Sequence, residues 1–267
     1  ALTRHLHGFV RDVKLTEVEL WAGIRVLAEL GQYTTDVRNE MMQASDIFGV
    51  SSLVALLAKP LTEVESPATI MGPFYRSNAP DCDRDDNISR TGSRAEQLVV
   101  DGRVLSSDGT PLPGATIDVW QADPNGFYEN QDPAQPDHNL RGKFGTGADG
   151  TYRFVTLRPG GYPVPTDGPI GRILEAQNRS PMRPAHIHFI VSAPGHETII
   201  TQLYIDEEQA LVDDVVLAVT APLVGHPDRV DALTDMTPPG VRTPYGAVTF
   251  DFHLRPGIPT FPVPPIP

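Results

Sequence analysis

The stretch Arg183-Pro184-Ala185-His186-Ile187-His188-Phe189-Ile190-Val191 carries the strongest signal for fold and function in this chain. It is rich in apolar and β-branched residues, which favours a β-strand. Residues two apart in a strand project from the same face, so His186 and His188 would place both imidazoles on one side. That geometry suits one metal ion, although alternating histidines also occur on a polar strand face that binds nothing. The pair alone leaves both interpretations open.

A second pair, His5 and His7, has the same spacing. No strand pattern surrounds it, and it lies close to the terminus, where chains are commonly poorly ordered. We expect this segment to be frayed and to bind no native metal.

Composition limits the kind of partner that the protein can have. The 267 residues can bury a substantial core, as one large domain or two small ones. The 27 prolines and 23 glycines favour turns and short strands over long helices. The net charge of −13 argues against nucleic acid, whose phosphates require a basic face. We therefore expect a small molecule or another protein as the partner.

The sequence favours a protein without a membrane span or a signal peptide. No apolar run reaches the ~18–20 residues that cross a bilayer, and the N-terminal residues lack the basic-then-apolar order of a signal peptide. Cys82 is the single cysteine, which excludes internal disulfide bonds and fits a reducing compartment. The sequence predicts a soluble, cytoplasmic protein without membrane attachment.

Residues 1–62 are expected to form a helical N-terminal domain. The capping-box pattern Thr16-Glu17-Val18-Glu19 predicts a helix over 15–31. A second helix is predicted over 35–48, and a short third one is predicted to begin at a Ser51 cap and to end before Pro60. The apolar stripes that support the first two helices are Val18, Trp21, Ile24 and Leu27 in one, and Val37, Met41, Ala44 and Phe48 in the other. A segment this short buries little apolar surface by itself. We therefore expect these helices to pack on the rest of the chain, on a second subunit, or on both.

The remaining chain reads as mainly β. Residues 63–96 form a linker that includes an apolar, pocket-lining segment at 70–75, and residues 97–267 form an antiparallel β-sandwich catalytic domain with a proline-rich C-terminal strap after Arg255. A turn is predicted at Ser107-Asp108-Gly109-Thr110 and a helix over 211–224. The predicted strands are 98–105, 115–120, 151–155, 186–192, 199–205 and 246–254.

Two histidines need further ligands to hold a metal. A carboxylate could complete a ferrous site, but the usual acidic residue two positions from a histidine is missing at His186 and His188. Tyr128 and Tyr162 lie in loops held by glycine or proline, where each could simply pack its ring. Together with the histidine pair they suit a trivalent cation, which holds a phenol as phenolate far below its ordinary pKa near 10.

These residues resemble the signature of the intradiol ring-cleaving dioxygenases, in the catechol and hydroxyquinol 1,2-dioxygenase branch. The resemblance spans at least residues 70–205, and the N-terminal helices are similar to the family's dimer-forming domain. The matching positions are Val100-Asp101-Gly102-Arg103-Val104, Gly109, Leu112, Ile117-Asp118-Val119, Gly126-Phe127-Tyr128, Tyr162 and the stretch from Arg183 to His188.

The resemblance implies one non-haem Fe(III) per subunit, held by Tyr128, Tyr162, His186 and His188. It also implies that Tyr162 leaves the metal when the diol binds and accepts a proton from it. Arg183 would stabilise negative charge on the ring, and Gln202 would lie near the iron. The substrate pocket would be lined by Ile70, Pro73, Phe74, Val164, Pro165 and Val216, with a further wall around Ser52 to Leu56.

By the same resemblance, the enzyme would cleave an aromatic 1,2-diol with O2 to a cis,cis-muconate, as part of aromatic degradation. The preferred diol stays open between catechol, hydroxyquinol and their chlorinated or methylated relatives. Gly72-Pro73-Phe74 and the Ser180–Arg183 segment favour hydroxyquinol. Gln202 favours catechol, and so does the apolar Ala55 or Leu56, where hydroxyquinol-type pockets often carry an aspartate.

Two other classes compete with this interpretation. One is a non-enzymatic β-sandwich binding module, which would not need the tyrosines and histidines to converge. The other is a zinc or ferrous enzyme that uses the histidines with a carboxylate. The helices favour a homodimer, and the family resemblance further implies that a lipid can occupy a groove between them.

Overall fold

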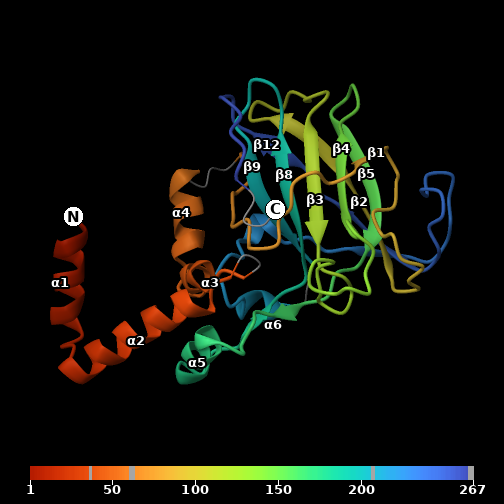
Figure 1. Ribbon diagram of the computed structural model, residues 1–267. Coiled ribbons are helices and arrows are strands. Elements are labelled where there is room, and N and C mark those ends of the chain that lie inside the picture. The colour runs from red at the N-terminus through yellow and green to blue at the C-terminus, as the bar shows by residue number, and fades with distance from the viewer. Residues whose placement is uncertain (36–37, 60–63, 206–207, 264–267) are drawn as a thin grey trace.

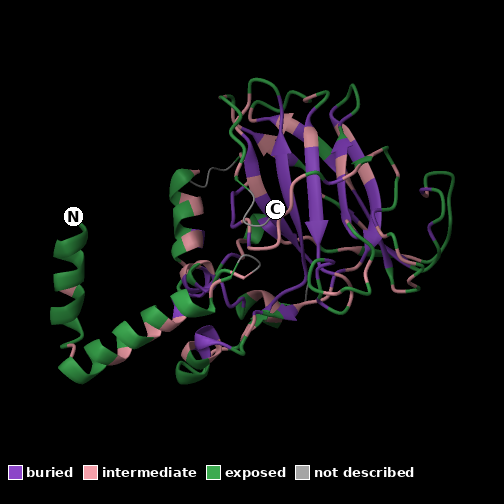
Figure 2. Ribbon diagram, viewed as in Figure 1, coloured by how far each residue is buried: buried purple, intermediate pink, exposed green. Residues whose placement is uncertain are grey.

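The computed structural model describes residues 1–35, 38–59, 64–205 and 208–263. Figure 1 shows two helices, α1 (Leu2–Asp12) and α2 (Glu17–Tyr33), projecting away from a body of strands. Two further helices, α3 (Glu40–Ile47) and α4 (Val50–Ala58), lie closer to that body. In Figure 2 the strands are mostly buried, whereas α1 and α2 are exposed along nearly their whole length.

The helix starts follow from their caps. The Thr16 side chain accepts from the Glu19 backbone N–H, and the Glu19 carboxylate accepts from the Thr16 N–H at 2.8 Å, so the predicted capping box is confirmed. The prediction that the N-terminal segment is frayed is wrong, because α1 covers it. His5 and His7 are two apart on this helix and therefore do not share a face.

The prediction for the second helix is wrong at its start and at two of its stripe residues, although Ala44 is buried as predicted. The helix starts at Glu40, after an Asn39 cap, rather than at 35. Met41 and Phe48 are exposed, and Val37 lies outside the described residues. The third helix begins after Gly49, whose φ of +69° suits glycine, and not at Ser51. The buried residues of α3 are Glu40, Gln43, Ala44, Asp46 and Ile47.

Within the described residues, two five-stranded sheets follow α1 to α4. The first has the order β1-β4-β3-β8-β9, and its strands are β1 (Asp81–Cys82), β4 (Arg141–Gly145), β3 (Thr116–Gln121), β8 (His186–Ser192) and β9 (Ile199–Tyr204). The second is centred on β2, and its strands are β2 (Gln97–Ser106), β5 (Thr151–Leu157), β10 (Asp228–Val230), β11 (Tyr245–Thr249) and β12 (Phe252–Leu254). A small two-stranded sheet pairs β6 (Tyr162–Pro163) with β7 (Met182–Arg183).

Strand direction departs in part from the antiparallel prediction. The pairs β3 with β4, β3 with β8, β8 with β9 and β2 with β5 are antiparallel, as predicted. The pairs β2 with β11, β2 with β12 and β1 with β4 are parallel, so both sheets are mixed. The parallel partners β11 and β12 begin more than a hundred residues after β2 ends, and so long a connection can cross over and enter in parallel, which a tight hairpin cannot.

One apolar cluster draws on both sheets. It contains Val100 and Phe154 from the second sheet together with Ile117 and Phe189 from the first. Gly102 in β2 allows the chain between β11 and β12 to come close, because a Cβ there would lie 2.1 Å from the Phe250 carbonyl oxygen. The glycine of the sequence signature thus has a packing role.

Several connecting elements differ from the predictions. A helix that was not predicted, α5 (Pro169–Ala176), lies beside α2 and α3. The predicted helix over 211–224 is largely irregular, with only α6 (Glu208–Val212) and the 3₁₀ turn η1 (Ala221–Leu223) in that region. The described part of the C-terminal tail exposes Ile258, Phe261 and Val263, while 264–267 lie outside the described residues.

Across the described ranges, we found no individual helix with both the length and the apolar character of a membrane span. The pair α3 and α4 meets the criterion only when taken together, and the two helices meet at a bend of 73°.

Candidate metal centre and substrate pocket

Four polar side chains meet in the interior. The Nε2 atoms of His186 and His188 are 3.0 Å apart, and the Tyr128 hydroxyl lies 3.0 Å from His188 Nε2. The two tyrosine hydroxyls are 3.1 Å apart, and the Tyr162 hydroxyl lies 3.5 Å from His186 Nε2. All four side chains are buried. The two histidines and two tyrosines singled out in the sequence therefore converge on one point.

Local structure explains this convergence. Along β8, Ile187, Phe189 and Val191 point into the apolar core, so His186 and His188 occupy the opposite face. Tyr128 follows β3 in a loop that turns at Gly126, where φ is +88°. A Cβ at Gly126 would lie 2.8 Å from the Cβ of Tyr162, so only glycine lets the two tyrosine-bearing segments approach.

The protonation of the four groups follows from burial. Burial lowers the pKa of His186 and His188 well below the ordinary value, so both imidazoles are neutral at pH 7. His186 Nδ1 lies 2.6 Å from the Pro184 carbonyl and donates to it, which leaves the Nε2 lone pair facing the centre. Burial also raises the pKa of Tyr128 and of Tyr162, whose hydroxyls stay protonated until a nearby cation favours the phenolate.

This set of donors fits a metal ion. Nitrogen and oxygen ligands lie about 2.0–2.1 Å from a first-row ion such as zinc, which places ligands of the same ion about 3 Å apart. The four donor atoms already have that spacing. The described residues contain no metal-binding group of three or more His, Cys, Asp or Glu side chains, and in this centre tyrosines complete the set.

A buried cation borders the centre. Arg183 Nη1 lies 3.1 Å from His186 Nε2, and Nη2 donates to Gln202 Oε1 at 3.0 Å. Burial alone would lower the pKa of Arg183, but Asp214, 3.1 Å from Nε, acts together with Tyr204 and Tyr162 and raises that pKa well above the ordinary value. Gln202 in turn donates to the Ile70 carbonyl at 2.8 Å. Sequence reasoning found Arg183 and Gln202 but missed Asp214, which no motif marks.

Aromatic rings enclose the ligands. Phe74 stacks on Tyr128 with ring centroids 4.5 Å apart, and Trp120 stacks on His188 at 4.7 Å. Arg141, which is 1% exposed, donates to the Phe74 carbonyl and to Glu129, the residue after Tyr128. These contacts fix the segment that carries Phe74 against the ligand loop.

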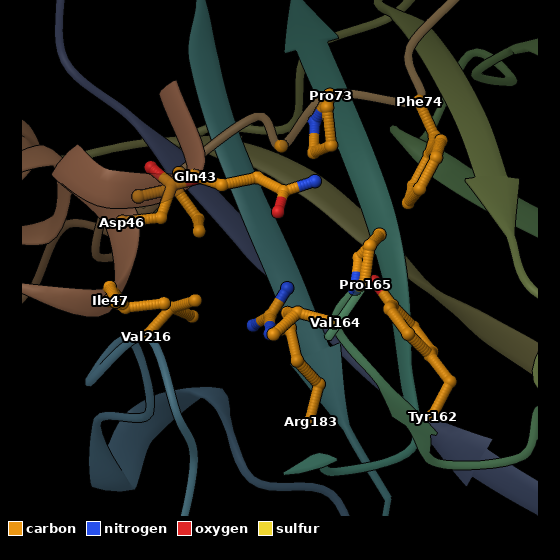
Figure 3. A pocket seen from close by; sticks show the side chains of 12 residues that line it. Gln43, Asp46, Ile47, Pro73, Phe74, Tyr162, Val164, Pro165, Arg183 and Val216 are labelled. Carbon is orange, nitrogen blue, oxygen red and sulfur yellow. The ribbon is translucent and has the colours of Figure 1, made fainter. Parts of the chain in front are cut away.

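A pocket adjoins the centre (Figure 3). Ile70, Pro73, Phe74, Val164, Pro165 and Val216 all line it, together with Tyr162 and Arg183. The wall predicted around Ser52 to Leu56 is wrong: Ser52 donates to the Val216 carbonyl, while Ala55 and Leu56 are absent from the lining. The wall is formed instead by α3, which contributes Gln43, Asp46 and Ile47.

Comparison with known proteins agrees with this arrangement. The dioxygenase family model matches residues 70–256, and the model for the catechol dioxygenase N terminus matches residues 1–65. The chain therefore belongs to the intradiol ring-cleaving dioxygenases and is an enzyme of that class.

Individual relatives make the likeness more specific. Hydroxyquinol 1,2-dioxygenase of Rhizobium sp. (strain MTP-10005) is 42% identical over 231 residues, which are 86% of this chain and 78% of that protein. The crystal structure of hydroxyquinol 1,2-dioxygenase from Pseudomonas putida DLL-E4 superposes with a TM-score of 0.89 at 38% identity, covering 96% of this chain and 90% of the other. Catechol 1,2-dioxygenase from Pseudomonas arvilla C-1 gives a TM-score of 0.82 at 30% identity, covering 96% and 83%.

Asp214→Ala should destabilise the fold, because it leaves the Arg183 guanidinium buried without its carboxylate. Breaking a buried ion pair costs about 3–5 kcal/mol. The neighbouring exposed Asp213→Ala is the matched control and should change stability by only about 0.5 kcal/mol. Urea unfolding of both variants at one protein concentration measures the difference. Equal stability of the two variants would show that Asp214 does not compensate Arg183.

Proposed function

We propose that this enzyme cleaves a hydroxyquinol-type 1,2-diol with O2, between the two hydroxyl-bearing carbons, to a cis,cis-muconate-type product. We further propose that a ferric ion binds at Tyr128, Tyr162, His186 and His188, on a β-sandwich formed by the two sheets. The observation that carries this proposal is the meeting of two neutral imidazoles and two phenols beside a pocket.

The side chains around the pocket have distinct roles in this proposal. When bound, the ferric ion supplies the redox chemistry that makes the diol ring reactive toward O2. Tyr162 lines the pocket and its hydroxyl lies 3.5 Å from His186 Nε2, so as phenolate it can accept a proton from the diol at Oη. The Arg183 guanidinium, held by Asp214 and Gln202, stabilises negative charge on the bound ring.

The position of Asp46 supports a substrate with a third hydroxyl group. It is 4% exposed and lines the pocket, and its Oδ1 has no hydrogen-bond partner within the described chain. Burial raises the pKa of Asp46, and a hydrogen bond from Ser51 partly opposes that rise. A hydroxyl opposite the two diol oxygens would pair with Oδ1, whereas catechol has no such group. This position on α3, not Ala55 or Leu56, supplies the acid expected of a hydroxyquinol-type pocket.

The exposed helices support assembly through the N-terminal region. Val18, Trp21 and Leu27 on α2 are 78%, 54% and 60% exposed in one chain. An apolar stripe of this kind is normally covered. We propose that two copies pair through α1 and α2, with a lipid chain between the helices as a second occupant that the family resemblance implies.

Oxygen uptake tests the substrate assignment. Iron-loaded protein should consume O2 with hydroxyquinol faster than with catechol, chlorocatechols or protocatechuate. Asp46→Ala should lower kcat/KM for hydroxyquinol about tenfold, because a hydroxyl without its buried partner loses about 1–3 kcal/mol. The same variant should leave catechol turnover unchanged.

Met41→Leu, on the exposed face of α3, is the control and should behave as the wild type. A wild type that prefers catechol, with no effect of Asp46→Ala, would refute the hydroxyquinol assignment. If iron-replete protein consumes none of the diols, the proposed reaction itself is wrong.

Sedimentation equilibrium tests the assembly. The wild type should sediment as a dimer, and the double variant Trp21→Glu, Leu27→Glu should sediment as a monomer, because it places charges on the paired stripe. Thr110→Glu, in an exposed turn of the strand region, should remain dimeric. A monomeric wild type, or a double variant that stays dimeric, would contradict pairing through α2.

A further inference from the structure

The pocket wall on α3 contains two buried polar side chains, and the proposed function uses only one. Gln43 and Asp46 are 6% and 4% exposed, and both line the pocket. They are three residues apart and therefore neighbours on one face of the helix. Asp46 pairs with a third hydroxyl in the proposed function, which leaves Gln43 without an assigned role.

Gln43 is also incompletely paired. Its Oε1 is buried and has no hydrogen-bond partner among the residues that the structure describes. Figure 3 shows the side chain reaching from α3 into the pocket. A buried amide oxygen without a partner costs free energy, so its position is explained if a bound molecule supplies the missing hydrogen bond.

The surroundings of Gln43 make its amide selective. The pocket-lining residues Ile47, Ile70, Val164 and Val216 have apolar side chains that form no hydrogen bonds, and the proposed function already uses the polar lining side chains Asp46, Tyr162 and Arg183. An amide both donates and accepts, so it can pair with a hydroxyl or an amino group on a ring. A methyl group or a chlorine in the same place would leave Oε1 unpaired.

We propose that Gln43 is a specificity-determining residue whose side-chain amide hydrogen-bonds a further polar substituent on the aromatic diol, beside the hydroxyl that Asp46 binds. This inference rests on the proposed function and extends it. The pocket then selects diols with two polar substituents besides the reacting pair, and it discriminates against the methylated or chlorinated counterparts.

Matched substrate pairs test this selection. The probes are hydroxyquinols that carry either a hydroxyl or a methyl group at ring position 3 or 5, the two positions beside the third hydroxyl. Dissociation constants are measured without oxygen, and kcat/KM is measured by oxygen uptake. At one of these positions the wild type should prefer the hydroxyl compound about tenfold in both measurements. Gln43→Leu should abolish or invert that preference while still cleaving hydroxyquinol.

The controls separate this inference from the function on which it rests. Asp46→Ala should weaken binding of every hydroxyquinol and keep the preference for hydroxyl over methyl, and Met41→Leu should change neither quantity. A wild type that cleaves hydroxyquinol but shows no such preference at either position overturns the role of Gln43 alone. The same holds if Gln43→Leu retains the preference. A wild type that cleaves no hydroxyquinol overturns the proposed function, and this inference with it.

Discussion

The structure depends on the burial of four electron-pair donors at one point. His186 and His188 come from β8, Tyr128 from a loop and Tyr162 from the short strand β6, yet their neighbouring ring nitrogens and hydroxyls lie 3.0–3.5 Å apart. Burial keeps the imidazoles neutral, and neutral imidazole is the form that binds a metal. Converging lone pairs are unfavourable unless they share a proton or a cation, so this cluster is arranged for a ligand more than for stability.

The surrounding structure holds these four side chains in their unfavourable arrangement. The alternation along β8 places Phe189 in the core and His188 at the centre, so one strand serves packing and function at once. Two buried ion pairs, Arg183 with Asp214 and Arg141 with Glu129, hold the neighbouring segments in place. Buried pairs contribute little net stability, but breaking one leaves an uncompensated buried charge, so both pairs hold the segments that they join.

Part of this arrangement could be predicted from the sequence because it follows local rules. The run of apolar and β-branched residues identified β8, and the capping box identified the start of α2. The same rules failed at α3. There the buried face carries Glu40, Gln43 and Asp46, while Met41 is exposed, so among the described residues of the predicted stripe only Ala44 faces inward. Prediction from hydrophobic periodicity assumes that buried residues are apolar. That assumption fails where a helix face lines a pocket with polar side chains. The partners Asp214 and Arg141 were missed because their roles arise from contacts between residues far apart in sequence.

The central claim is that two phenolates and two imidazoles bind one ferric ion. Resonance Raman spectra of the iron-loaded protein, excited in its visible band, test this claim most directly. The account predicts iron-tyrosinate vibrations in the wild type, with part of that signal lost in Tyr128→Phe and a different part lost in Tyr162→Phe. A colourless iron-loaded protein, or a spectrum that neither substitution alters, would contradict the account.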